Sequence, residues 1–435
     1  MMYIILFGIH MMCKGKRIIR RWLMSTTIIG LGLFNIRCSF NLLVLHLEQD
    51  LSMPVDYQGT EVFEGYIIPT IGSLPAQQSP RNANENYQKI QNRVESLSCR
   101  IQNETYHFPP FPSFIIVGAQ KGGTTAMYNL LKEIQEIKGS HSEEAHFFEY
   151  LPGDPQSWSV EDICKARKRY FMLNFGEIQA NTAVEYPNVL RFEKTPKYML
   201  YPNIARKIAT VVFPKPKILI SVRNPVDRAF SEYRMAYSRK QLQRRNQLTA
   251  SKTDQGRAEM EKNLKPVASF EMWVDKSIKG MRKKGLTKMP LFSPNITDWD
   301  NMNLSGVDDM AISLSTNVKS YSGIIQRGLY APQIKAYLKY WTPDVDLKVI
   351  AFDDLRKDPN KTLSLILEFV GAKPHNLTIH QLSKDFSPSF SYSKEVPILP
   401  VLKNTTRSYL SRFYRPYNFE LAQLLGESKY RFLWE

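Results

Sequence analysis

The feature that most constrains this chain is an apolar run that ends in a glycine-rich loop and continues directly into a helical pattern. Residues 114–117 are apolar, residues 118–125 read Gly-Ala-Gln-Lys-Gly-Gly-Thr-Thr, and residues 127–134 carry apolar side chains at helical spacing. Backbone N–H groups converge where a strand turns through glycines into a helix, and the helix N-terminus favours negative charge. The stretch therefore predicts a phosphate-binding loop between a buried strand and a helix.

The loop differs in one respect from the usual nucleotide-binding pattern, G-x-x-x-x-G-K-[ST]. Gly118, Gly123 and Thr125 keep its spacing, but Thr124 stands where the lysine belongs, and Lys121 lies inside the loop instead. The loop thus offers a cation beside the first phosphate and hydroxyls at the helix start. A kinase that uses ATP is one alternative, against which the displaced lysine argues. A plain glycine turn between a core strand and a helix is another.

A second motif begins where another apolar run, residues 218–222, ends at Arg223. From there the chain reads Arg-Asn-Pro-Val-Asp-Arg-Ala-Phe-Ser-Glu-Tyr. Open α/β sheets bind ligands at the carboxyl ends of their strands, and Pro225 suits the first turn of a helix. Ser231 follows two turns into that helix. A guanidinium and a hydroxyl at one place suit a terminal phosphate monoester.

These two motifs resemble those of the sulfotransferases that use 3′-phosphoadenylyl sulfate (PAPS), above all the Golgi carbohydrate enzymes that modify heparan and chondroitin chains. The second motif is similar to the family pattern R-(D/N)-P-x-(D/E)-R-x-x-S-x-Y. The resemblance implies that Arg223 and Ser231 hold the 3′-phosphate of PAPS. It implies that the 5′-phosphosulfate is held by Lys121, Gly122, Gly123, Thr124 and Thr125.

Between the two motifs, residues 142–149 read Ser-Glu-Glu-Ala-His-Phe-Phe-Glu. Glu144 and His146 would lie on one side of a short strand or turn, and a carboxylate and an imidazole near a phosphate loop suit general base catalysis. A surface acidic turn with a core Phe pair is the alternative. The segment resembles the family's K-E-x-H-F-F-D, which implies that Glu144 is the base and His146 its neighbouring histidine. Glu143 replaces the lysine of that pattern, and Glu149 replaces its aspartate.

Three further stretches resemble weaker family elements. Residues 191–198 resemble an E-K-T-P segment of the acceptor cleft. This resemblance implies that Lys194 lies near the transferring sulfo group. The alternative is that Lys194 is a surface lysine before a proline turn. Residues 324–331 resemble an R-G-x-Y element on the cofactor side, and residues 413–418 resemble F-Y-x-P-x-N. The cysteine-bridged K-G-R hairpin of heparan-type members is missing, although Lys394 remains a candidate cofactor contact.

The resemblance implies a single α/β domain with P-loop kinase-like topology, in which a central parallel sheet of about five strands is flanked by helices. Apolar patterns predict a strand over residues 347–352 and helices over residues 362–370 and 410–425. In the implied mechanism Glu144 accepts the proton of a sugar hydroxyl or glucosamine nitrogen. Lys121 and Lys194 stabilise the charge that develops on the leaving phosphate and the sulfo group, and no metal is required.

The implied acceptor is a glycan of the heparan or chondroitin type, and protein tyrosine or a non-catalytic role in glycan binding are the alternatives. The formal net charge of +17 and pI of about 9.5 fit an acidic partner. Nucleic acid is disfavoured because no zinc finger, homeodomain or RNA-binding signature is present. The four cysteines have no C-x-x-C spacing, which argues against structural zinc. Cys99 and Cys164 either pair in an oxidising lumen or remain free thiols.

The N-terminal region predicts a membrane anchor. A basic block over residues 14–21 precedes a mostly apolar run over residues 22–47, which resembles a signal anchor with a cytosolic N-terminus. Arg37 interrupts this run, and an arginine within a membrane costs roughly 2.5–3.5 kcal/mol. A cleaved signal peptide, or upstream sequence before a later initiator methionine, is the alternative.

The expected organisation has three parts. Residues 1–47 are the cytosolic tail and transmembrane anchor, residues 48–110 are a polar lumenal stem, and residues 111–435 are the sulfotransferase domain. A basic insertion over residues 239–320 would cover the acceptor groove. The chain is accordingly expected to be a single-pass type II protein of the Golgi membrane, with its catalytic domain in the lumen.

Overall fold

The structure is a computed structural model. Apart from a few isolated positions, the residues that it describes are 98–110, 112–176, 189–250, 266–284, 323–373 and 399–426. All of them belong to one compact unit, Ile71–Glu435. The expected anchor, most of the stem, much of the basic insertion and Lys394 lie outside the described residues and stay predictions. Within the described ranges, no helix combines the length and apolar character needed to cross a membrane.

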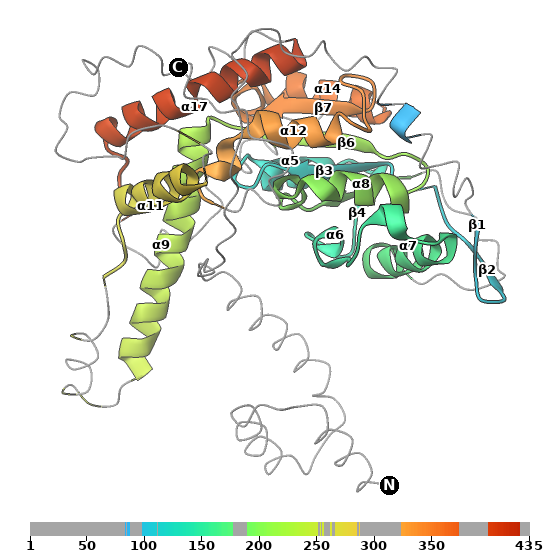
Figure 1. The fold of residues 1–435 in the computed structure, drawn as a ribbon, viewed down its shortest axis with the longest axis horizontal. Coiled ribbons are helices and arrows are strands. Elements are labelled where there is room, and N and C mark those ends of the chain that lie inside the picture. The colour runs from blue at the N-terminus through green and yellow to red at the C-terminus, as the bar shows by residue number, and fades with distance from the viewer. Residues whose placement is uncertain are drawn as a thin grey trace, which may run out of the picture. The chain divides into compact units, whose positions relative to one another are not determined.

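Five parallel strands form a central sheet in the order β4-β5-β3-β6-β7, which confirms the predicted sheet (Figure 1). Their bounds are Phe114–Gly118 for β3, Ile137–Gly139 for β4, Leu190–Lys194 for β5, Lys217–Val222 for β6 and Leu347–Ala351 for β7. The middle strand, β3, places Ile115 opposite Glu193 on one side and Ile218 on the other. Every residue of β3 is buried, as expected for a parallel strand covered on both faces.

Helices cover both faces of this sheet. Ile115 and Val117 of β3 pack with α7 (Val160–Asn174), α8 (Pro202–Val211) and α12 (Tyr330–Tyr337). Phe114 and Ile116 point to the opposite face, because successive strand side chains alternate, and pack with α5 (Thr124–Lys132) and α14 (Pro359–Val370). The smaller elements are β1 (Ser98–Ile101), β2 (Glu104–His107), α6 (Phe147–Tyr150), α13 (Phe352–Lys357) and the short 3-10 turns η1 (Pro155–Ser157), η2 (Tyr198–Leu200) and η4 (Gln326–Gly328).

A separate apolar cluster joins α9 (Pro225–Ala250), α11 (Phe270–Lys283) and α17 (Asn404–Leu425). Because α9 is continuous to Ala250, the insertion boundary expected at residue 239 falls inside a helix. The Arg, Lys and Gln residues there are good helix formers, and their polarity does not interrupt the helix. Within the expected insertion, α11 forms an amphipathic helix, and α17 starts several residues before the predicted Leu410.

A disulfide joins Cys99 on β1 to Cys164 on α7. Of the two sequence alternatives for these cysteines, the structure therefore contains the paired one. The bond fastens the β1–β2 hairpin to a helix that packs on the central sheet. Both cysteines are buried, so the link lies within the apolar core rather than on the surface.

We expect loss of this disulfide to lower stability substantially. The two cysteines are 65 residues apart, and closing a loop of that length in the unfolded chain corresponds to about 4 kcal/mol in the chain-entropy treatment. Cys99→Ala, Cys164→Ala and the double variant should each lose about this much in urea unfolding. Additive losses in the double variant would contradict the pairing, because residues that form one bond share one interaction.

Candidate active site

The glycine loop lies at the carboxyl edge of the sheet, between β3 and α5. The N–H of Ala119 donates to the carbonyl of Ser221 on β6 at 2.7 Å. In return, the hydroxyl of Ser221 donates to the carbonyl of Gly122 at 2.7 Å. The loop that follows β3 is thereby fastened to the end of the neighbouring strand, as predicted for a strand–loop–helix phosphate site.

Close packing requires glycine at two loop positions. A Cβ atom on Gly122 would lie 2.5 Å from the carbonyl oxygen of Ser221, and Gly123 has a φ of 96° and a position where a Cβ would overlap the Phe352 ring. Gly123 is also the N-cap of α5 and provides no side-chain acceptor for the first-turn N–H groups. A helix start of this kind suits an anionic oxygen, and its first residues are Thr124 and Thr125.

Lys121 belongs to this loop, and its side chain reaches α9. Its Nζ is 3.8 Å from the sulfur of Met235. Burial lowers the pKa of Lys121 to about 8; Glu232 opposes this effect, and the nearby cations Arg239 and Arg223 add to it. The charged form of a lysine that is partly desolvated and close to other cations would be strongly stabilised by a phosphate or sulfate. The charges around Lys121 therefore fit a polyanionic ligand.

Arg223 follows the last residue of β6, so it lies at the same edge of the sheet as the glycine loop. Its guanidinium carbon is 5.7 Å from the ring centroid of Phe352, the ring that also packs against Gly123. The Tyr330 hydroxyl donates to the Arg223 carbonyl at 2.7 Å and fixes the backbone there. Ser231 is half-buried on the second turn of α9. The sheet thus brings the two predicted phosphate motifs to one edge.

A buried ionic network behind the loop was not predicted from the sequence motifs. The carboxylate of Glu232 accepts from Arg228 Nη1 at 2.7 Å and from Arg327 Nη1 at 2.5 Å. Arg327 also donates to the side chain of Gln120, inside the glycine loop, at 2.6 Å. The arginine of the R-G-x-Y element therefore braces the loop through Gln120. The four-residue spacing of Arg228 and Glu232 in the sequence could have indicated their ion pair, because residues four apart lie on the same face of a helix.

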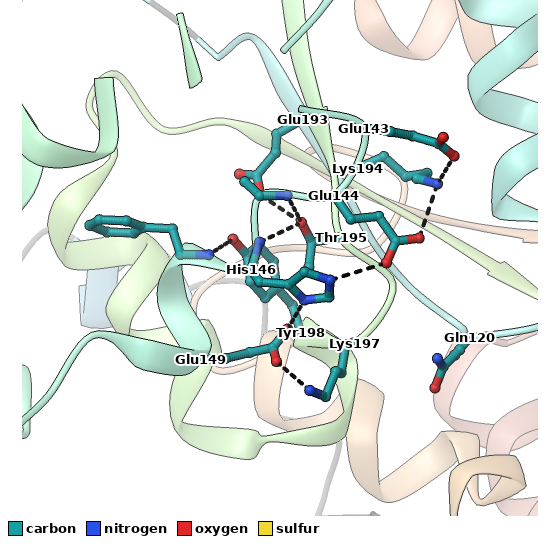
Figure 2. Close-up of polar contacts among 12 residues, drawn as sticks. Gln120, Glu143, Glu144, His146, Glu149, Glu193, Lys194, Thr195, Lys197 and Tyr198 are labelled. Atoms are coloured by element: carbon teal, nitrogen blue, oxygen red, sulfur yellow. Dashed lines mark hydrogen bonds and ion pairs between the residues drawn. The ribbon is translucent and has the colours of Figure 1, made fainter. Parts of the chain in front are cut away.

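On the other side of the glycine loop, Lys194 at the end of β5 lies between two carboxylates (Figure 2). Its Nζ is 2.5 Å from Glu143 and 3.1 Å from Glu144, and its side chain is fully buried. Glu144 also lies 3.4 Å from Nε2 of His146. The structure therefore brings the predicted site residues Glu144, His146 and Lys194 together, and adds Glu143, which stands where the family pattern has a lysine.

The cluster holds Glu144 ionised and His146 protonated. Burial raises the pKa of Glu144, but the hydrogen bond from His146 and the charge of Lys194 outweigh it, so that this pKa is lowered. Burial likewise lowers the pKa of His146, but hydrogen bonds to Glu144 and Glu149 outweigh it and raise the pKa to about 9. Glu149 lies 2.7 Å from His146 Nδ1 and 2.9 Å from Lys197. At neutral pH only the carboxylate can accept a proton, and its side chain is 36% exposed.

The raised pKa of His146 predicts a pH-dependent stability. The histidine has a pKa of about 9 when folded and about 6.5 when unfolded, so its contribution is complete below pH 6.5 and is lost as the pH rises through 9. The difference in unfolding free energy between the wild type and His146→Gln should shrink by about 2 kcal/mol across this window, with partial exposure taken into account. NMR titration of His146 measures the pKa directly, and a midpoint near 6.5 would contradict the cluster.

The family model of the sulfotransferase domain matches residues 111–413. A mouse protein, bifunctional heparan sulfate N-deacetylase/N-sulfotransferase 4, is 23% identical over 329 residues, which cover 72% of this chain and 30% of that protein. Human heparan sulfate glucosamine 3-O-sulfotransferase 6 is 29% identical over 129 residues, 30% of this chain and 32% of that protein. The matched region thus spans about a third of these curated relatives.

Among solved structures, a sulfotransferase from Alicyclobacillus acidocaldarius covers 74% of this chain and 99% of its own, at 22% identity and a TM-score of 0.45. The match to the family model is more informative, because it spans more than half of the chain and includes the glycine loop, the Glu144 segment and the Arg223 motif. The chain therefore belongs to the sulfotransferase family, and this membership implies PAPS as the sulfo donor.

Proposed function

We propose that the chain transfers the sulfo group of PAPS to a hydroxyl or amino group of a glycan, of the heparan or chondroitin type. The observation that carries this proposal is the position of the Glu144 carboxylate. It lies between the ammonium of Lys194 and the imidazole of His146, and Lys194 ends the strand next to the one that leads into the glycine loop. The proposed base and the glycine loop proposed to bind phosphate thereby share one edge of the sheet.

The residues at this edge fit the donor. The backbone of Gly122 and Gly123, which a Cβ atom would obstruct, together with the start of α5 and the cation of Lys121, would hold the 5′-phosphosulfate. Arg223 and Ser231 would hold the 3′-phosphate. The donor, when bound, supplies an activated sulfo group. What remains for the protein is to position the acceptor, remove its proton and stabilise the charge that develops.

Glu144 is the group that takes the acceptor proton in this proposal. Its lowered pKa keeps it ionised at neutral pH, and its partial exposure leaves it open to an acceptor. The same interactions make it a weak base. A weak base suffices for this reaction, because the attacking oxygen becomes more acidic as its bond to sulfur forms. Lys194 and Lys121 supply positive charge on the two sides of the reacting centre.

The acceptor proposal draws support from the charge of α9 and α11. Residues 234–250 and 276–284 contain many cations and no Asp or Glu. The two helices contact each other through Tyr233, whose ring centroid lies 5.6 Å from that of Trp273. The cations are Arg234, Arg239, Lys240, Arg244 and Arg245 on α9, and Lys276, Lys279, Arg282 and Lys283 on α11. Because α9 begins beside Arg223, an anionic polysaccharide that follows these helices would reach the donor site.

The proposed compartment is the lumen of the Golgi, with residues 1–47 as a membrane anchor. The disulfide between Cys99 and Cys164 supports an oxidising compartment, where such bonds persist. Residues 103–105 read Asn-Glu-Thr, an N-glycosylation acceptor sequence. Asn103 is exposed in the turn between β1 and β2, where an attached glycan would not meet the core.

We expect Glu144→Gln to remove most activity without weakening donor binding. Loss of a general base costs about 10²–10⁴ in kcat. The glutamine is close in size, and the ionic partners of Glu144 described above are Lys194 and His146, so binding of adenosine 3′,5′-bisphosphate in calorimetry should stay within about twofold. Glu161→Gln, an exposed carboxylate on α7, is the matched control and should keep full activity. Sulfotransfer by Glu144→Gln at the wild-type rate would remove Glu144 from the mechanism.

The acceptor is tested with labelled PAPS and a panel of desulfated heparan, chondroitin and dermatan chains, with a tyrosine peptide as the comparison. Arg244→Glu with Arg245→Glu should raise the KM for the polysaccharide by about tenfold at low salt and leave kcat nearly unchanged. Lys357→Glu with Lys361→Glu makes the same change in net charge outside α9 and α11, and serves as the control. Transfer to the peptide alone would contradict a glycan acceptor.

A further inference from the structure

We propose that Glu193, a buried carboxylate behind the reacting groups, is a positioning residue for the segment that carries Glu144 and His146. The inference rests on the proposed function, because it assigns to Glu193 the task of holding the base in place. Glu193 lies on β5, beside Lys194, and points to the face of the sheet opposite the exposed carboxylates (Figure 2). Glu193 is the first residue of the E-K-T-P segment, but the resemblance assigns a role only to the lysine that follows it.

Three hydroxyl groups interact with Glu193, and two of them donate hydrogen bonds to it. Tyr170 on α7 donates to its Oε2 at 2.7 Å, and Thr195 donates to its Oε1 at 2.8 Å. Burial raises the pKa of Glu193, and the third hydroxyl, that of Tyr198, opposes this effect. All four side chains are buried. A carboxylate away from water needs such donors, since a buried unpaired charge is costly.

Two of these hydroxyls connect Glu193 to the active-site segment. Thr195 Oγ1 accepts the backbone N–H of Ala145 at 3.0 Å and that of His146 at 3.5 Å. The Tyr198 hydroxyl accepts the N–H of Phe147 at 3.0 Å and that of Phe148 at 3.4 Å. A hydroxyl has one proton, and donating it to Glu193 leaves only lone pairs for the backbone. The N–H groups of Ala145 and His146 therefore end on an oxygen that Glu193 orients, and those of Phe147 and Phe148 end on the neighbouring Tyr198 hydroxyl.

The segment needs this support because its backbone is unfavourable on its own. His146 has a φ of 53°, a left-handed conformation that is uncommon for residues other than glycine. It is also the N-cap of α6, and its side chain does not cap that helix. The acceptors provided by Thr195 and Tyr198 replace a cap for the first N–H groups of α6. They thereby hold His146 where its ring reaches Glu144 on one side and Glu149 on the other.

Replacement of Glu193 by glutamine would reverse one of these hydrogen bonds. Glutamine keeps the size of the side chain but presents an NH₂ group, which donates, in place of one carboxylate oxygen. The hydroxyl that faces this NH₂ must then accept from it, in competition with the backbone N–H groups. The segment from Ala145 to Phe148 would lose part of its fixed geometry. A residue with only a core-packing role would lower stability and leave the geometry of the folded enzyme unchanged.

The test compares Glu193→Gln, Thr195→Val and Thr195→Ser in the full chain. Glu193→Gln and Thr195→Val should lower kcat by about tenfold or more, with the KM for PAPS and the binding of adenosine 3′,5′-bisphosphate unchanged. Thr195→Ser keeps the hydroxyl and should retain kcat within about threefold. The pKa of His146, measured by NMR, should fall from about 9 toward its ordinary value of 6.5 in the first two variants and not in the third.

The control variant is Ile366→Val, which removes one buried methylene from α14 in the core on the opposite face of the sheet. It should lower the melting temperature without changing kcat or the pKa of His146. The proposal is overturned if folded Glu193→Gln keeps both the wild-type kcat and the wild-type pKa of His146. It is also overturned if kcat falls as much in Thr195→Ser as in Thr195→Val. If the wild type transfers no sulfo group to any acceptor, the proposed function fails. The NMR titration would still decide whether Glu193 positions His146.

Discussion

The parallel pairing of β3 between β5 and β6 is the constraint on which the site depends. Parallel strands end at the same edge of a sheet, so three segments remote in the sequence meet there: the glycine loop after β3, Lys194 at the end of β5 and Arg223 after β6. Reciprocal hydrogen bonds between the loop and Ser221 fix the first and third of these relative to each other. A slip of one residue in either pairing would turn every strand side chain to the other face.

Alternation of charge explains how so many ionic groups share a partly buried site. Two buried ions have partners of opposite sign: Lys194 lies between Glu143 and Glu144, and Glu232 lies between Arg228 and Arg327. Isolated charges in such places would be neutralised or excluded. The arrangement has a chemical consequence, because the cations that keep a carboxylate ionised also make it a weaker base. Sulfo transfer tolerates that weakness better than a reaction that must remove a proton before the new bond forms.

Sequence reasoning located the parts of the site that depend on local motifs. The glycine loop and Arg223 were found because strand, turn and helix signals stand beside them, and the closing strand and helices followed from apolar periodicity. The bridge from Arg327 to Gln120 and the support of Ala145 and His146 by Glu193 could not be predicted, because their partners meet only after the sheet has formed. The extent of α9 was missed for another reason: its polar composition looks like a loop, although its residues favour a helix.

The central claim is that one doubly phosphorylated adenosine spans the glycine loop and Arg223. Calorimetry with adenosine 3′,5′-bisphosphate and with AMP, which lacks the 3′-phosphate, tests it directly on the wild type and on Arg223→Gln. The account predicts that the wild type binds the bisphosphate at least about tenfold more tightly than AMP and that Arg223→Gln abolishes this difference, as expected for loss of a charge-assisted contact. Equal affinities in the wild type, or a preference that survives in Arg223→Gln, would contradict it.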